Sequence, residues 1–135
     1  LLPYSAQAMF DLVNDIESYP EFMDGCLGAE MLSKTDTEIQ ARLDLGKAGF
    51  KYSFTTKNSL TPPNSMSMEL VDGPFKHFDA RWTFDALTEE ACKASLDMHF
   101  EFKSGLLDLA LKNLFDASCK NLMNAVCKRA DKLYG

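Results

Sequence analysis

The chain has 135 residues and a formal net charge of −6 at pH 7, with 46% hydrophobic and 25% charged residues. This length and composition are typical of one soluble globular domain with a single core. No apolar run reaches the roughly 18 residues of a membrane span, and no secretory signal is visible. The acidic balance argues against sequence-independent nucleic-acid binding, which requires a basic surface, so we expect no DNA partner.

The first elements are short and helical. Residues 1–4 predict the end of a strand, and Ser5 is a suitable N-cap for a helix over 6–14. Pro20 favours a second short helical turn before Asp24-Gly25, because proline fits the first turn of a helix.

From Gly28 onward the hydrophobic period changes to two, which is typical of strands. The pattern predicts a meander of about six antiparallel strands over 29–34, 37–45, 50–60, 66–70, 78–85 and 94–103. Turn residues separate them at 46–49, 61–64, 72–74 and 88–90. One face of this sheet is apolar and needs a covering layer.

The last stretch, Gly105–Gly135, supplies that layer. Ser104 is a suitable N-cap, and Asp116 with Lys120 forms an i,i+4 ion pair. Apolar residues at helical spacing predict one buried stripe, made of Leu107, Leu111, Leu114, Phe115, Leu122, Ala125, Val126 and Leu133. We therefore expect one long helix packed across the sheet.

Four cysteines are present, at Cys26, Cys92, Cys119 and Cys127. They form no CxxC pair, and neither histidine lies near them at zinc-site spacing. We expect reduced, buried thiols in a cytoplasmic protein, with no bound metal.

The order of elements resembles the helix-grip, START-like fold, an α+β architecture. Several motifs are similar to the coenzyme Q-binding branch of that superfamily, which includes the bacterial ribosome-association toxins (RatA). These motifs are Tyr19-Pro20-Glu21-Phe22 with Gly25-Cys26, Lys47-Ala48-Gly49, Phe54-Thr55-Thr56 with Asn58, Leu70-Val71-Asp72-Gly73-Pro74-Phe75, and Trp82-Thr83-Phe84. Asp24 departs from the family, which usually has proline there.

The resemblance implies a single START-like domain over 1–135, with the first strand of the fold lying before Leu1. It implies a non-catalytic protein that holds ubiquinone as a bound ligand, not as a catalytic cofactor, in an apolar tunnel. The implied role is quinone delivery for respiration, with transient contact to the inner membrane. The alternative role is binding to the large ribosomal subunit and inhibition of its joining to the small one. Because the superfamily also contains cyclases, an enzyme is a further alternative.

The residues themselves give little support for catalysis. His77 lies in a turn-like stretch and His99 on the polar face, so we expect both to be exposed and structural. Neither has an evident Ser or Cys nucleophile with an orienting acid. The segment 46–49 is too short for a phosphate-binding loop and connects two strands.

A ligand pocket has better support, because the inward face is rich in aromatic and methionine side chains. Methionine adapts to irregular guests, and small Ser118 and Ala125 at the centre of the helix stripe leave room opposite the sheet. Tyr52, Trp82 and Ser118 supply polar contacts. The simpler interpretation is that these residues only form the core. The predicted ligand-binding residues are Phe50, Tyr52, Phe54, Met66, Met68, Trp82, Phe84, Met98, Phe100, Leu111, Phe115, Ser118 and Leu122.

Two surface interpretations are also open. Candidate cations for ribosome contact are Lys47, Lys51, Lys128, Arg129 and Lys132. The simpler interpretation of the last three is that they complement the helix dipole and aid solubility. A protein-partner surface would use the outer helix residues Leu109, Met123 and Cys127, although scattered apolar residues need no explanation.

Overall fold

A computed structural model describes residues 2–47, 50–102 and 109–135. Two short helices come first, α1 (Ala6–Asn14) and the 3-10 helix η1 (Ile16–Glu21). Six strands and one long helix, α2 (Leu109–Tyr134), follow. The strands are β1 (Cys26–Lys34), β2 (Glu38–Lys47), β3 (Phe50–Thr61), β4 (Ser65–Asp72), β5 (Phe75–Thr88) and β6 (Ala91–Phe102). The Ser5 side chain accepts a hydrogen bond from the Ala8 N–H, which confirms the predicted cap of α1.

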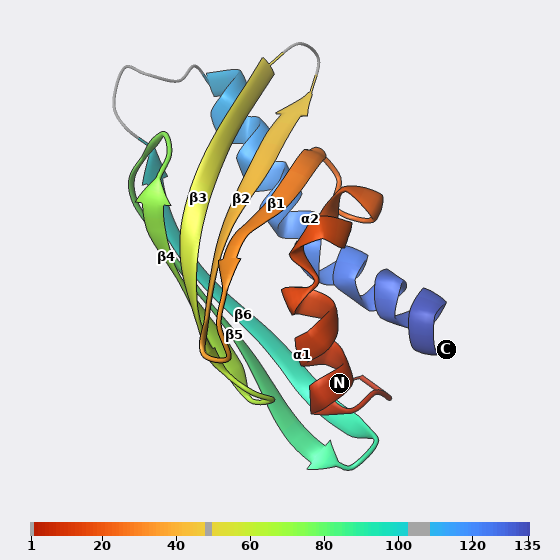
Figure 1. Cartoon of the computed structure of the whole chain (residues 1–135). Helices are drawn as coiled ribbons and strands as arrows, with labels where there is room; N and C mark the ends of the chain where they lie inside the picture. The colour runs from red at the N-terminus through yellow and green to blue at the C-terminus, as the bar shows by residue number, and fades with distance from the viewer. Residues whose placement is uncertain (1, 48–49, 103–108) are drawn as a thin grey trace.

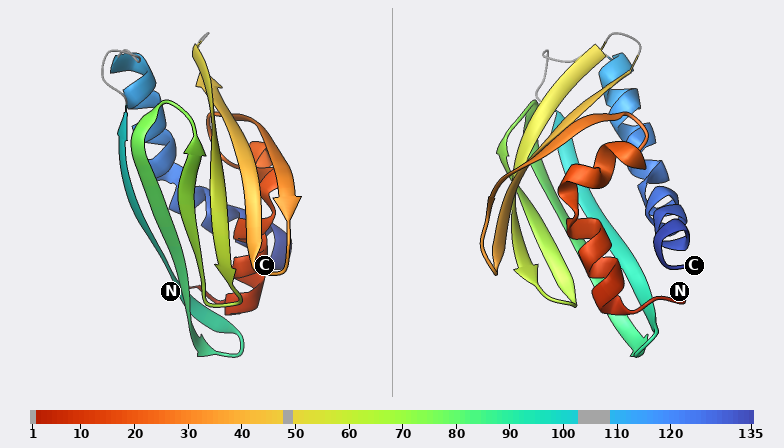
Figure 2. Two further views of the ribbon diagram at one scale, coloured as in Figure 1. Left: turned by 60° about the vertical axis from the view of Figure 1, so that its left-hand side comes forward. Right: turned by 45° about the vertical axis from the view of Figure 1, so that its right-hand side comes forward.

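The strands form one antiparallel sheet in the order β1-β2-β3-β4-β5-β6, which confirms the predicted meander. The sheet is curved, and α1, η1 and α2 all lie on its concave side (Figures 1 and 2). This is the expected helix-grip architecture. Leu2 forms an isolated antiparallel bridge with Cys92 of β6, in agreement with the predicted end of a strand at 1–4.

Alternation places the inner face as predicted over most of the sheet, but β5 differs from the prediction. His77 belongs to this strand and not to a turn. The register shifts between Phe75 and His77, which marks a β-bulge, and both Phe75 and Phe78 are buried. An extra residue in a strand breaks the period of two, so both rings reach the same face.

Helix α2 presents a buried face made of Phe115, Ser118, Leu122, Val126 and Ala130. The predicted stripe was wrong at Leu133, which is 50% exposed. The last turns of α2 lie beside α1 and not over the sheet, and the Tyr134 hydroxyl donates to the Ala8 carbonyl (Figure 1).

The predicted orientations of two other α2 residues were wrong. Ala125 faces an outer groove instead of the sheet, and Met123, assigned to the outer side, packs against the core. Cys127 is half-buried. The predicted Asp116–Lys120 pair is present at 3.0 Å. The predicted cap Ser104 and Leu107 lie outside the described residues, as do the side chains of Leu109, Leu111 and Leu114.

None of the described helices is long and apolar enough to cross a membrane.

Candidate functional site

A small apolar cavity lies between the sheet and α2. Every layer contributes to its wall: Tyr19 and Met23 from the η1 region, Leu43 of β2, Phe54 of β3, Met68 of β4, Phe78 and Trp82 of β5, Met98 of β6, and Phe115, Cys119 and Leu122 of α2. Its volume is about 30 Å³. An engineered apolar cavity of about 150 Å³ binds benzene, so side chains must move before this smaller cavity can hold a guest of that size.

The structure brings only part of the predicted ligand site to this cavity. Phe54, Met68, Trp82, Met98, Phe115 and Leu122 line it. Met66, Phe84 and Ser118 are buried elsewhere in the core. Tyr52 and Phe100 are partly buried and pack against the core, but they do not line the cavity. The side chains of Phe50 and Leu111 lie outside the described part of the chain.

The prediction missed other members of the wall, chiefly Tyr19, Met23, Leu43 and Cys119. Leu43 could have been found, because it shares the inward face with Ile39, Ala41 and Leu45 by alternation. Tyr19 and Met23 come from a segment without strand or α-helix periodicity, so no pattern indicated their position.

The predicted opening at Ser118 is absent, since Ser118 is 3% exposed and does not line the cavity. Phe115, one turn away on α2, contacts the rings of Tyr52, Phe54, Phe75, Phe78, Phe100 and Phe102, and we call these seven residues the aromatic cluster. The closest ring in the cluster is Phe100, whose centroid lies 4.7 Å from that of Phe115. The cluster explains why the cavity is small.

The polar groups nearest the cavity are held in their neutral forms. The Tyr19 hydroxyl donates to the Val13 carbonyl at 2.5 Å. Burial raises the pKa of the Cys119 thiol to about 12, and its sulfur lies 3.4 Å from the Met98 sulfur. Burial also raises the pKa of the Tyr52 hydroxyl, which has no hydrogen-bond partner within the described structure. The site therefore offers an apolar surface with adaptable methionines instead of an acid, a base or a thiolate.

The two histidines are exposed, as predicted, and pair with carboxylates on the outer face of the sheet. His77 Nδ1 lies 3.8 Å from Glu101, and His99 Nδ1 lies 3.5 Å from Asp79. The cysteines are free thiols, and burial raises the pKa of Cys26 to about 11. Among the described residues no group of three or more His, Cys, Asp or Glu side chains could hold a metal ion.

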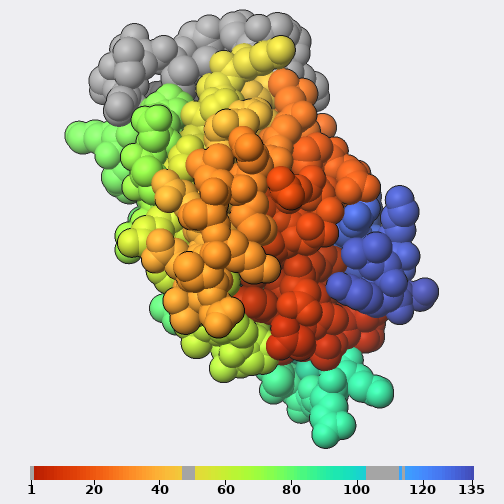
Figure 3. Space-filling model, viewed as in Figure 1, coloured from red at the N-terminus to blue at the C-terminus, as the bar shows by residue number. Residues whose placement is uncertain are grey.

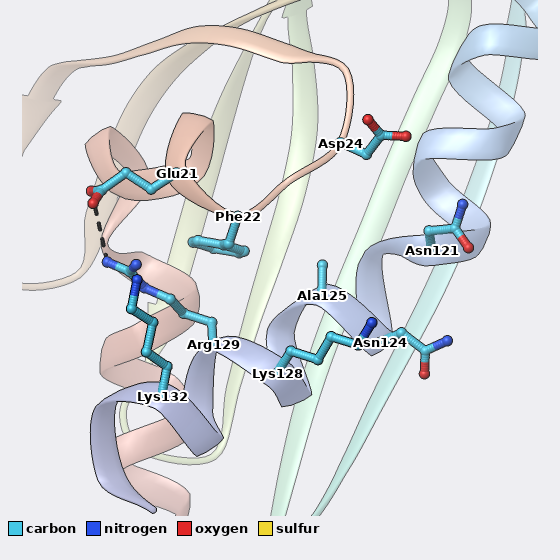
Figure 4. A pocket seen from close by; sticks show the side chains of 9 residues that line it. All are labelled: Glu21, Phe22, Asp24, Asn121, Asn124, Ala125, Lys128, Arg129 and Lys132. Carbon is cyan, nitrogen blue, oxygen red and sulfur yellow. Dashed lines mark ion pairs between the residues drawn. The ribbon is translucent and has the colours of Figure 1, made fainter.

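A second site lies on the outside, between η1 and the C-terminal half of α2. We call it the basic groove and define it by Asn121, Asn124, Ala125, Lys128, Arg129 and Lys132 of α2 with Glu21, Phe22 and Asp24 of the opposite wall (Figure 4). Its volume is about 440 Å³. The space-filling view shows the segment after η1 meeting the last turns of α2 at the surface (Figure 3).

Arg129 joins the two walls of the basic groove. Its guanidinium carbon lies 5.5 Å from the centre of the Phe22 ring, and one of its nitrogens lies 3.7 Å from a Glu21 carboxylate oxygen. Its side chain is only 11% exposed. Lys128 and Lys132 are exposed and, among the described residues, have no carboxylate within 4.0 Å. Two unneutralised amines therefore line the same concave surface.

Comparison with known proteins identifies relatives over almost the whole chain. Residues 2–127 match the family model described as polyketide cyclase / dehydrase and lipid transport. The chain is 44% identical to the ribosome association toxin RatA of Vibrio cholerae, covering 100% of this chain and 94% of that protein. It is 42% identical to RatA of Escherichia coli K12, with 99% and 85% covered. The coenzyme Q-binding protein COQ10 of Drosophila melanogaster is 28% identical, with 85% and 49% covered.

Solved structures show the same fold at low sequence identity. A START superfamily protein from Mycobacterium smegmatis has a TM-score of 0.79 at 23% identity, covering 98% of this chain and 93% of that one. The Zhui aromatase/cyclase of Streptomyces has a TM-score of 0.82 at 18% identity, covering 97% and 89%.

Proposed function

The chain belongs to the polyketide cyclase / dehydrase and lipid transport family, and we propose that it binds the large ribosomal subunit and hinders its joining to the small subunit. The observation that carries this proposal is the identity of 42–44% over nearly the full chain with proteins named ribosome association toxin.

The basic groove supports this proposal. The simpler interpretation of Lys128, Arg129 and Lys132 was that they complement the helix dipole and aid solubility. Arg129 also links the walls of the groove, and the two lysines line the same concave surface without an ion pair to Glu21 or Asp24. A local basic patch on an acidic protein is the kind of surface that ribosome contact requires.

Cosedimentation with isolated large subunits tests the proposal. We expect the protein to pellet with large subunits at 50 mM salt and to lower the fraction of joined ribosomes in a sucrose gradient. If two phosphates are neutralised, raising the salt from 50 to 200 mM should weaken binding about tenfold. Protein that stays in the supernatant with large subunits at low salt would contradict the proposal.

A second candidate function is the binding of ubiquinone or a similar apolar molecule. The apolar cavity favours it, together with the similarity to COQ10. At about 30 Å³ the cavity must expand to admit a quinone ring, and the flexible side chains of Met68 and Met98 are the wall residues best suited to move.

Lipid analysis tests this second candidate. Solvent extraction of the purified protein followed by mass spectrometry should reveal a co-purifying quinone or lipid. A short-chain ubiquinone at about 100 times its dissociation constant should stabilise the fold by about 2.7 kcal/mol, measured as a rise in melting temperature. If no lipid is found and the melting temperature does not change, the cavity is a packing feature of the core.

A further inference from the structure

We propose that the basic groove binds an RNA strand and that Lys128 and Lys132 each contact a backbone phosphate. The proposal rests on the proposed ribosome association and deepens it, because it assigns the contact to one surface and to one chemical class of ligand.

The spacing along α2 gives the groove a continuous polar floor. Asn121, Asn124, Ala125, Lys128 and Lys132 recur at intervals of three and four, so they share one face of the helix. The small side chain of Ala125 leaves depth between its larger neighbours. Lysine and asparagine are side chains that contact phosphate and sugar oxygens in nucleic-acid complexes.

The two lysines can contact separate phosphates of one strand. Their backbones lie one helical turn apart, about 6 Å along the axis. Their side chains extend to opposite sides, that of Lys128 toward Asn124 and that of Lys132 toward Arg129 (Figure 4). Lys57 and Lys120, by contrast, are already paired with carboxylates. Among the described residues, Lys34, Lys51, Lys76 and Lys93 have no ion pair either, but they lie on strands and outside the groove. Lys128 and Lys132 are therefore available to replace the counterions of an RNA backbone.

The acidic residues of the groove do not cancel this charge. Glu21 is paired with Arg129. Asp24 lies beside Asn121, at the end of the groove away from Lys132 (Figure 4). Two positive charges therefore remain to contact phosphates, Lys128 on the Asn124 side of the groove and Lys132 on the Arg129 side (Figure 4).

The opposite wall is preorganised. Stacking of Arg129 on Phe22 and its ion pair with Glu21 hold the segment after η1 against α2. A groove whose shape is fixed before binding loses less entropy when a ligand enters it. Arg129 therefore acts as a positioning residue. Because the groove is concave, it suits a strand that enters it better than it suits a flat bilayer surface.

Two double variants, each of which removes two positive charges, test the inference. The variant Lys128→Gln with Lys132→Gln is compared with Lys76→Gln plus Lys93→Gln, which removes two exposed lysines of β5 and β6. Binding is measured by cosedimentation with large ribosomal subunits and by fluorescence anisotropy of a labelled RNA hairpin, each over a salt series. Circular dichroism and thermal melting check that each variant is folded.

We expect the groove variant to bind both probes at least tenfold more weakly at 100 mM salt. The slope of log K against log salt should fall by about 1.4–1.8, since each phosphate contact contributes about 0.7–0.9. The control variant should match the unmodified protein, and Lys128→Arg with Lys132→Arg should restore binding.

The outcomes separate this inference from the proposed function. If the unmodified protein pellets with large subunits and the groove variant does so with equal affinity and slope, the inference is wrong and the proposed function stands. If the protein does not pellet with subunits but binds the hairpin through the two lysines, the groove assignment stands and the proposed function fails. Absence of both activities overturns both. Groove-dependent binding to phosphatidylglycerol vesicles without hairpin binding overturns the assignment to RNA.

Discussion

Replacing Phe115 with alanine is expected to lower the free energy of unfolding by about 3–5 kcal/mol, the usual cost of removing a buried phenylalanine ring. The side chain of Phe115 is 2% exposed. Small domains have a total stability of about 5–15 kcal/mol, so this one substitution removes a large fraction of it. Urea unfolding followed by circular dichroism measures the loss.

The reason is the position of Phe115 between layers. From α2 it contacts rings on β3, β5 and β6, including Phe100 at 4.7 Å and Phe75 at 5.1 Å between centroids. Edge-to-face pairs of this kind add stability beyond the area that they bury. Removing the ring therefore leaves a cavity and weakens the attachment of α2 to the sheet.

Leu133→Ala is the matched control for Phe115→Ala. Leu133 lies on the same helix and is 50% exposed, so its replacement should change stability by less than about 0.5 kcal/mol. A loss below 1 kcal/mol for Phe115→Ala would show that α2 does not depend on the aromatic cluster.

The sheet was the most predictable part of the fold. Alternation identified each strand to within a few residues, because one face of the sheet is buried and the other is wet. It missed the start of β5, because a β-bulge between Phe75 and His77 interrupts the alternation and the predicted strand began only at residue 78. A bulge depends on backbone geometry at one position, and the hydrophobic pattern does not record it.

The helix and its cavity were harder to predict. Periodicity correctly indicated Phe115, Leu122 and Val126, but it could not show that the last turns of α2 leave the sheet and expose Leu133. Small residues at Ser118 and Ala125 suggested an empty space, yet neither lines the cavity. A gap in one element becomes a cavity only if the facing elements leave it open, and those elements come from distant segments of the chain.

A buried polar pair was also overlooked, although its position follows from alternation. Thr56 and Asn58 continue the inward face of β3 after Phe54, and Asn58 is 0% exposed. The Thr56 hydroxyl donates to Asn58 Oδ1 at 2.8 Å. Asn58 Nδ2 has no hydrogen-bond partner within the described structure. This pair lies in an apolar core, so any charge placed there is poorly solvated.

Asn58→Asp should therefore destabilise the fold in a pH-dependent manner. The two side chains have nearly the same shape, so the substitution changes mainly the charge. Burial raises a carboxyl pKa by about 3 units or more above its unfolded value of about 3.9. Because the folded-state pKa is the higher one, the penalty is absent below about pH 4. It then grows by about 1.4 kcal/mol per pH unit until the pH passes the folded-state pKa, reaching about 4 kcal/mol at pH 7.

Urea unfolding at pH 4 and pH 7, each compared with the unmodified protein at the same pH, measures this penalty. Asn58→Leu is the control, since it removes the same amide without adding a titratable group. Its cost should be about 1–2 kcal/mol and should not differ between the two pH values, because it reflects only the lost hydrogen bond and altered packing. If Asn58→Asp loses less than about 1 kcal/mol more at pH 7 than at pH 4, the introduced carboxylate is hydrated. Water would then reach the interior between the sheet and its helices, and the core would be more open than its packing indicates.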